Sequence, residues 1–238
     1  MTGEVFAARG REFSLERTLI LGILNVTSDS FSDGGDYLDP EKALARAAQM
    51  EEEGADILDV GGQSTRPGYT LLSPQEEWAR LEPVLPRLVE RTRCAVSVDT
   101  FYPEVARKAL AAGAHILNDV TGFGDEMMAL AAESGCGCIV MCPTGGDGED
   151  VIERTRQFFL ERVAAAEKRG IPRERLVLDP GVGFGTTREE DVKLLARARD
   201  LKVPGCGLMI AASRKRVTAL GNDAAPKDRL AATLAAHT

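Results

Sequence analysis

The chain has 238 residues and a hydrophobic content of 44%, enough to form one large domain with a sizeable core. Its 29 basic and 37 acidic residues give a net charge of −8, which argues against nucleic acid or an anionic membrane as the main partner. The five cysteines lack CxxC spacing, no signal-peptide pattern opens the chain, and no apolar run approaches the roughly 20 residues that span a bilayer, so we expect a soluble cytoplasmic protein without disulfides or zinc.

Short apolar runs recur along the chain and predict strands. Each run has the length and composition typical of a strand buried on both faces of a parallel sheet. Residues 1–18 precede them as an amino-terminal segment, with a possible hairpin around Arg9 to Arg11. The predicted strands are residues 19–26, 55–62, 94–99, 115–121, 136–142, 175–181 and 207–213.

Segments with helical periodicity separate these strands. Several begin at a proline and end at a glycine, the asymmetry expected of helix starts and stops. Pro83 and Pro86 interrupt the second segment, so we predict a kink or two pieces there. The alternation of strand, loop and helix predicts a parallel sheet, either closed as a barrel or doubly wound, in one domain over residues 1–238.

Polar residues at the carboxyl ends of the strands favour the barrel. A doubly wound sheet gathers functional groups at one switch point, whereas a barrel brings all its strand ends to one mouth. We therefore predict a TIM (β/α)8-type barrel with seven visible strand-helix units. The expected eighth unit is absent, so either the sequence is truncated or the barrel is open, with two exposed strand edges and apolar surface. The strand-end residues are Asn25, Asp59, Asp99, Asn118 with Asp119, Asp179, and Ser213 with Lys215.

Four of these side chains are hydrogen-bond acceptors that would meet at the mouth: Asp59, Asp99, Asn118 and Asp179. Buried carboxylates and amides are costly unless they find partners. Such a cavity suits a flat heterocycle with several N–H donors, such as a pterin or a guanine-like ring. The alternative for each residue alone is that it caps the following loop or helix.

Basic residues and an amide predict an anion site at the same mouth. Thr65 and Arg66 in "STRPG", and the three cations of "SRKR" at residues 213–216, follow strands directly and could bind phosphate oxygens. The alternative for "SRKR" is a solvated helix start. Asn25 could contribute its carbonyl oxygen to a Mg²⁺ shell completed by water and phosphate oxygens.

With these residues located, the sequence resembles the dihydropteroate synthase family, the folate-pathway enzymes that sulfonamides inhibit. The resemblance runs from about residue 19 to the end through "GILNVTSDSFSDGG", "DVGGQSTRPG", "SVDT", "NDVTG", "LDPGVGFG" and "SRK", in the family's order. It implies a (β/α)8 barrel, usually dimeric, that joins 6-hydroxymethyl-7,8-dihydropterin diphosphate to p-aminobenzoate with release of pyrophosphate and uses Mg²⁺.

The resemblance also implies roles for individual residues. The C–O bond to the diphosphate would break early. Asp99 and Asp179 would stabilise the resulting pterin cation. The leaving pyrophosphate would be stabilised by Lys215, Arg66 and Mg²⁺. The loops after the first two strands would close over the substrates. By this resemblance the pterin would be bound by Asp99, Asn118, Asp179, Lys215 and Met141, the diphosphate and p-aminobenzoate by Thr65, Arg66, Pro67, Phe184 and Ser213, and Mg²⁺ by Asn25.

The sequence also departs from the family pattern, mainly around anion and p-aminobenzoate recognition. It has Ser28 for the usual Pro, Gln63 for Glu, Thr186 for Lys and Ala211 for Gly; "VMCPTGG" replaces a Met-His-Met run, and the closing Arg-x-His motif is absent. Three alternatives therefore stand beside an active synthase: a pterin-binding paralogue or truncated domain without turnover, a folate-dependent methyltransferase, and a barrel enzyme acting on another phosphorylated heterocycle.

Overall fold

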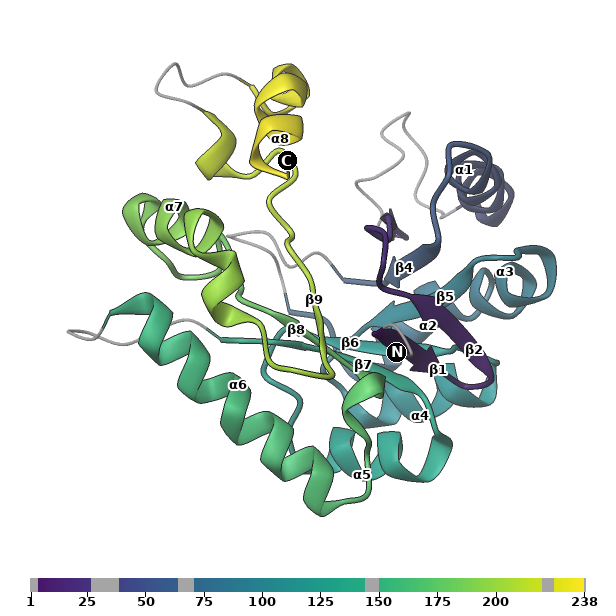
Figure 1. The fold of residues 1–238 in the computed structure, drawn as a ribbon. Coiled ribbons are helices and arrows are strands. Elements are labelled where there is room, and N and C mark those ends of the chain that lie inside the picture. Colours follow the sequence, from purple (N-terminus) through teal and green to yellow (C-terminus); the bar gives the residue numbers. More distant parts are fainter. Residues whose placement is uncertain (1–3, 27–38, 64–70, 144–149, 220–224, 238) are drawn as a thin grey trace.

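The computed structural model describes residues 4–26, 39–63, 71–143, 150–219 and 225–237, and its centre is a curled parallel sheet (Figure 1). Each strand of this sheet lies within a predicted apolar run. The strands are β3 (Leu21–Asn25), β4 (Ile57–Gly61), β5 (Ala95–Asp99), β6 (Ile116–Asp119), β7 (Gly137–Met141), β8 (Leu176–Asp179) and β9 (Gly207–Leu208).

The order of the strands in the sheet is their order in the chain, from β3 to β9. A doubly wound sheet would reverse its order at a switch point, and no reversal occurs among the described strands. The sheet curls instead (Figure 1), and the carboxyl ends of its parallel strands lie along one rim. The fold is therefore the predicted barrel type, with seven strands forming a partial barrel.

Helices separate the strands, as predicted. Ser73 and Thr187 start α2 and α7 with capping boxes, closed by Glu76 and Glu190. The segment containing Pro83 and Pro86 is divided into two helices, α2 and α3, as the prolines indicated. The helices are α1 (Pro40–Glu52), α2 (Pro74–Leu81), α3 (Leu85–Arg91), α4 (Pro103–Ala111), α5 (Asp125–Ser134), α6 (Val151–Lys168), α7 (Arg188–Ala196) and α8 (Leu230–Ala236).

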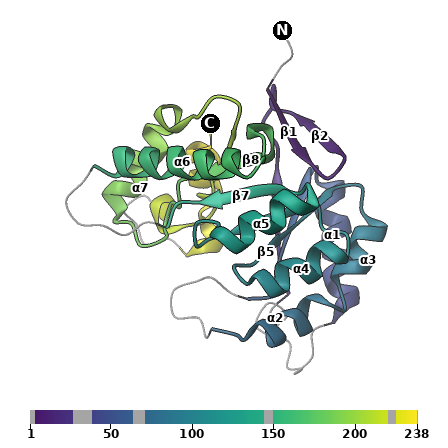
Figure 2. The same cartoon turned by 90° about the horizontal axis from the view of Figure 1, so that it is seen from below.

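The main core lies between the outer face of the sheet and these helices (Figure 2). Outward-facing strand residues such as Val60, Val98 and Leu117 are fully buried. One hydrophobic cluster lies beneath α1 to α4, and a second extends beneath α5, α6 and α7. Burial on the outer face leaves the inner face of the sheet for function.

The amino-terminal segment covers one end of the inner face. Its strands β1 (Val5–Ala8) and β2 (Arg11–Ser14) pair antiparallel, and Phe6 packs with Ile57, Ile116 and Ile139 on the inner face. Arg9 fixes the hairpin by donating from Nη1 to the carbonyl oxygens of Leu110 and Ala114, at 2.7 and 2.9 Å. The amino-terminal end of the sheet is therefore filled, and the carboxyl end is left for function.

The two edges of the described sheet are β3 and β9. Exposed apolar side chains lie near both: Ile20 and Ile23 at β3, and Leu230 and Leu234 on α8, are each more than half exposed. The open edges and apolar surface expected from seven units are thus present in the described part of the chain.

The last strand is shorter than predicted. A strand over residues 207–213 was expected, but β9 covers only Gly207 and Leu208. Met209 still donates its N–H to the carbonyl of Leu178, at 2.9 Å, and beyond it the chain leaves the sheet. β9 has β8 on one side only, so no second ladder extends it.

Among the described residues, no helix combines the length and apolarity needed to cross a membrane.

Candidate active site

A row of polar side chains crosses the inner face of the sheet at the carboxyl ends of its strands. Register partners in neighbouring parallel strands project from the same face. Asn25 is paired with Gly61, Gly61 with Asp99, and Asp99 with Asn118, across β3, β4, β5 and β6. Predicted site residues from three strands are thereby brought side by side.

The glycine in this row leaves space between Asn25 and Asp99. A Cβ atom added to Gly61 would lie 3.6 Å from Oδ1 of Asn25 and 3.8 Å from Cβ of Asp99, an ordinary contact distance. The carbonyl oxygen of Asn25 therefore lies beside Asp99 at the mouth of the partial barrel. An amide oxygen in this position is a ligand type that Mg²⁺ accepts.

Among the described residues, no group of three or more His, Cys, Asp and Glu side chains could hold a metal ion. Beside Asn25, a magnesium ion would take further oxygen ligands from a bound substrate and from water. This donor set fits the chemistry of Mg²⁺, which keeps several waters and often binds through substrate phosphates.

Asp59 and Asn118 are joined beneath the row. Nδ2 of Asn118 donates to Oδ2 of Asp59 at 3.0 Å, and both side chains are buried. Oδ1 of Asp59 has no hydrogen-bond partner. Burial raises the pKa of Asp59, and the neighbouring Ser97 and Asn118 offset part of that rise. The pair leaves one unsatisfied acceptor on the inner face.

Of the predicted site residues, Asp99 lies in the surroundings least favourable to a negative charge. Burial raises its pKa well above the usual value, and the negative charges of Asp59, Glu77 and Asp119 raise the pKa further. A carboxyl group in this state takes up a proton readily, or is stabilised by donors from a ligand. Asp99 is thus suited to pair with the N–H groups of a heterocycle.

Asp119 turns out to have a structural role. It follows Asn118 directly on β6 and so projects from the opposite face. Its carboxylate accepts hydrogen bonds from the N–H of Thr121, at 2.7 Å, from the Thr121 hydroxyl, and from the N–H of Phe123, at 3.1 Å. Of the two polar residues predicted at this strand end, only Asn118 belongs to the inner face.

Asp179 lies at the end of β8, in register with Met141 of β7. Its Oδ1 accepts the N–H of Gly181 at 2.8 Å. Burial raises the pKa of Asp179, while the charge of Lys215 and the Gly181 hydrogen bond lower it. The buried Met141 forms an apolar wall beside this carboxylate, and both predicted pterin residues therefore lie on one side of the mouth.

Lys215 projects toward the loop that follows β8. Its Nζ donates to the carbonyl oxygen of Val182 at 2.7 Å and lies 4.5 Å from the centre of the Phe184 ring. Burial lowers the pKa of Lys215, and the charges of Asp179 and Asp191 counteract that effect. A lysine, an aromatic ring and a carboxylate thus meet at the end of β8.

Of the other cations of "SRKR", Arg216 turns toward the loop that follows β8, and the joint anion site stays a prediction. The backbone N–H of Arg214 donates to the hydroxyl of Thr233 on α8. Arg216 donates from Nη2 to the carbonyl oxygen of Thr186, at 2.8 Å, and pairs with Asp191. Ser213 is exposed at the surface. Lys215 alone of the three contributes charge to Asp179.

Two buried carboxylates were missed by the sequence reasoning, Asp191 in the first turn of α7 and Glu77 on α2. Glu77 is 1% exposed and neither of its oxygens makes a hydrogen bond. Burial raises the pKa of Glu77 to about 7, and Thr100 offsets only part of that effect. A usable signal existed, because Glu77 lies four residues before the buried Leu81 on the same helix face.

The predicted diphosphate residues Thr65, Arg66 and Pro67 lie outside the described residues, as does Ser28. The preceding Gln63 is described and buried. Its Oε1 accepts the N–H of Leu72 at 2.6 Å, while its Nε2 has no hydrogen-bond partner. Gln63 therefore ties the end of β4 to the segment that leads into α2.

Together the inner-face groups form a site rich in acceptors, with the partly buried ammonium of Lys215 beside it. Such a site can hold a flat ring through several N–H donors, and it can stabilise positive charge that develops on that ring. The carboxyl end of the sheet is the usual position of an active site in a barrel of this type.

Comparisons with known proteins agree with this chemistry. The family model for pterin binding enzymes matches residues 21–238. A dihydropteroate synthase of Escherichia coli is 37% identical over 237 residues, covering 96% of this chain and 84% of that enzyme. The structure of a Xanthomonas albilineans dihydropteroate synthase with 4-aminobenzoic acid matches with a TM-score of 0.93 and 41% identity, covering 99% of this chain and 88% of that one.

A further relative is longer. A probable bifunctional folylpolyglutamate synthase/dihydropteroate synthase of Haloferax volcanii is 43% identical over 227 residues, which are 92% of this chain but 27% of that protein. The chain thus spans about a quarter of the length of this bifunctional relative.

Proposed function

The chain belongs to the pterin-binding enzyme family, as a relative of the dihydropteroate synthases, and we propose that it is a transferase that condenses 6-hydroxymethyl-7,8-dihydropterin diphosphate with p-aminobenzoate. The products are 7,8-dihydropteroate and pyrophosphate. The single observation that carries this proposal is the row of inner-face acceptors that joins Asp99 to Asn118 at the carboxyl ends of the strands.

The pterin binds on the inner face, where acceptors meet its N–H donors. Asp99, Asn118 and Asp179 accept these hydrogen bonds, Met141 packs against the ring, and Lys215 donates to it. What supports this assignment is that desolvation raises the pKa values of both carboxyls, Asp59 and Asp99. Donors from a bound ring would relieve the cost of that burial.

The second substrate and the diphosphate bind farther toward the loops. Phe184 and Ser213 line the p-aminobenzoate pocket, and Thr65, Arg66 and Pro67 contact the diphosphate and p-aminobenzoate. Asn25 holds Mg²⁺ together with the diphosphate, and this ion would neutralise charge on the leaving group. The aromatic ring of Phe184, which is close to the Lys215 ammonium, supports the placement of an aryl carboxylate there.

The residues act by electrostatic preorganisation. Asp99 and Asp179 stabilise positive charge that develops on the pterin methylene as its bond to the diphosphate oxygen breaks. Lys215 and Arg66 stabilise the pyrophosphate, and the amine of p-aminobenzoate then attacks the methylene. The groups of the chain are fixed before reaction, so little reorganisation is needed at the transition state.

Calorimetric titration with the dihydropterin diphosphate and Mg²⁺, followed by p-aminobenzoate and a pyrophosphate-release assay, tests the proposal. Binding followed by release is the expected result. Binding without release would instead indicate a pterin-binding paralogue or a domain that lacks a required part. An absence of binding would refute the pterin assignment.

Mg²⁺ dependence, a cytoplasmic location and a homodimeric assembly stay predictions.

A further inference from the structure

Asp191 is completely buried in the first turn of α7, yet it reaches back to the loop that precedes this helix. Its Oδ1 accepts the N–H of Gly183 at 2.8 Å and the hydroxyl of Thr186. The N–H of Gly183 also lies 3.1 Å from that hydroxyl. One carboxylate oxygen therefore fixes two points of the loop formed by residues 180–187, which we call the glycine loop.

Arg216 holds the same loop from the other side. Its Nη2 donates to the carbonyl oxygen of Thr186 at 2.8 Å and lies 3.6 Å from Oδ2 of Asp191. Oδ2 has no hydrogen-bond partner, so the positive charges of Arg216 and Lys215 compensate its negative charge. A buried carboxylate without such a partner would be strongly unfavourable.

The glycine loop carries groups that face the candidate active site. Val182 accepts the hydrogen bond of Lys215 through its carbonyl oxygen, and Phe184 lies beneath the Lys215 ammonium. The chain passes close to the lysine at Gly183, where an added Cβ would lie 3.2 Å from Cδ of Lys215. A shift of the loop would therefore move the Phe184 ring and the oxygen that holds Lys215 together.

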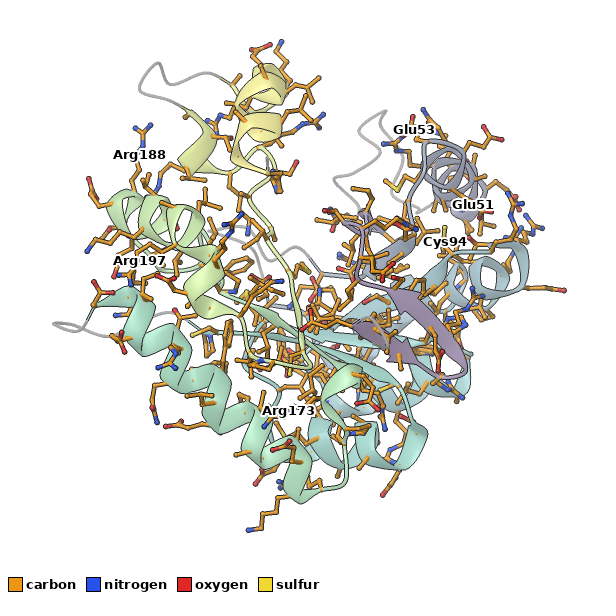
Figure 3. The ribbon with its side chains drawn as sticks, in the orientation of Figure 1. Glu51, Glu53, Cys94, Arg173, Arg188 and Arg197 are labelled. Atoms are coloured by element: carbon orange, nitrogen blue, oxygen red, sulfur yellow. The ribbon has the colours of Figure 1, made fainter. Side chains whose placement is uncertain are left out.

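Helix capping does not account for Asp191. The start of α7 is already capped by the reciprocal hydrogen bonds of Thr187 and Glu190. The charged residues at its two ends, Arg188 and Arg197, point outward from the helix (Figure 3). Asp191 instead points into the loop, so its contacts serve the loop and not the beginning of the helix.

We propose that Asp191 and Arg216 are positioning residues that fix the glycine loop, so that Phe184 is presented to p-aminobenzoate in one arrangement. The proposal deepens the proposed function and rests on it for the identity of the substrate. Neither residue needs to touch the substrate. Because small displacements of binding groups are costly for catalysis, we expect the loss of either residue to weaken the use of p-aminobenzoate.

The test compares Asp191→Ala, Asp191→Asn and Arg216→Gln in the complete chain. Asp191→Ala should raise the KM for p-aminobenzoate about tenfold and weaken binding of the dihydropterin diphosphate, to which Lys215 contributes, by a smaller factor. Asp191→Asn keeps an oxygen that can accept from Gly183 and Thr186, so it should recover most of the loss. The matched control is Glu189→Gln, which removes an exposed charge from the same helical turn and should leave both constants unchanged.

A second readout does not depend on turnover. The amide of Gly183 donates to Asp191, so its hydrogen exchange should be about tenfold faster in Asp191→Ala and nearly normal in Asp191→Asn. If Asp191→Ala does not fold, the Arg216→Gln and Asp191→Asn variants and their combination still test the pair, because coupled residues give non-additive changes in KM.

The outcomes separate this inference from the proposed function. Faster Gly183 exchange with an unchanged KM for p-aminobenzoate would overturn the positioning role and leave a purely structural one. Unchanged exchange would overturn the inference altogether. If the wild-type chain binds p-aminobenzoate without turnover, the same comparison is made on its dissociation constant. If it binds no p-aminobenzoate, the proposed function fails, and altered exchange still supports the loop contacts.

Discussion

The side-chain amide of Asn118 donates to Oδ2 of Asp59 at 3.0 Å, although 59 residues separate the two along the chain. The contact links β6 to β4 across β5 on the inner face of the sheet. It also orients the amide, because Nδ2 is committed to Asp59 and the carbonyl oxygen of Asn118 is left for a ligand. The buried Asp59 thus acts as a support for a predicted pterin residue.

Replacing Asn118 with leucine should harm both stability and binding. The substitution removes the only donor that the structure shows for Oδ2 of Asp59, leaving a buried acceptor unpaired, which costs about 1–3 kcal/mol. We expect the free energy of unfolding to fall by that amount in urea denaturation and pterin affinity to fall at least about tenfold. A variant with both properties unchanged would show that the Asp59–Asn118 contact supports nothing.

Replacing Glu77 with glutamine should change the pH dependence of stability. The pKa of Glu77 is raised to about 7 in the folded protein, so its contribution is fully present below the ordinary glutamate pKa and is lost as the pH rises toward 7. In Glu77→Gln this loss should be absent. The free energy of unfolding of the variant should exceed that of the wild type by on the order of 1–3 kcal/mol at pH 8, but not at pH 4.

Urea denaturation at several pH values measures this difference, and Glu82→Gln, an exposed neighbour in sequence, is the control. Equal slopes of stability against pH in wild type and Glu77→Gln would contradict the assignment of a raised pKa to Glu77.

The arrangement of the strands could be predicted from the sequence because it depends on local signals. Each buried parallel strand lies within a mainly apolar run, and all the described helices except α5 and α8 start with a proline or a side-chain cap. β9 was predicted too long because residues 209–213 are as apolar as a strand, whereas strand pairing depends on a neighbour that the sequence pattern does not show. Pairing is a tertiary property.

The candidate site could be predicted only in part, for a similar reason. Asn25, Asp99, Asn118 and Asp179 were found because strand ends share one edge of a sheet. Asp191 was missed because its side chain contacts a loop that precedes its own helix, and no periodicity in the sequence indicates such contacts. The direction of Arg216 was also unpredictable, since consecutive residues in an irregular segment point to different neighbours.

Replacing Lys215 with methionine should raise the pKa of Asp179 further, since the lysine charge now lowers it. A raised folded-state pKa contributes stability at low pH that is lost as the pH rises through that value. The stability of Lys215→Met should therefore fall more between pH 5 and pH 8 than that of the wild type. Carbon NMR titration of the Asp179 carboxyl checks the direction; a lower pKa would contradict it.

The turnover of Lys215→Met should also fall about a hundredfold relative to the wild type.

Replacing Asp99 with alanine should abolish measurable pterin binding, because it removes the acceptor in the middle of the inner-face row. Folding should be retained, since the variant also removes a partly buried carboxyl whose pKa is raised well above the usual value. Arg66→Ala is the matched comparison, and it should spare pterin binding while suppressing the steps that depend on the diphosphate. Calorimetry with the pterin and with its diphosphate distinguishes the two variants. Unchanged pterin affinity in Asp99→Ala would show that the pterin pocket is wrongly placed.

Two glycines at the site should differ in how strongly they respond to alanine. Gly181 has a positive φ of 74°, and its added Cβ would lie 2.5 Å from the carbonyl oxygen of Cys142, so something must shift. Because the N–H of Gly181 holds Asp179, Gly181→Ala should lower the free energy of unfolding by about 2–4 kcal/mol and weaken pterin binding. Gly61→Ala adds a methyl at ordinary contact distances and should cost less than about 1 kcal/mol. Thermal denaturation and pterin titration of both variants check the contrast, and equal effects would mean that the backbone at Gly181 is not constrained as the structure indicates.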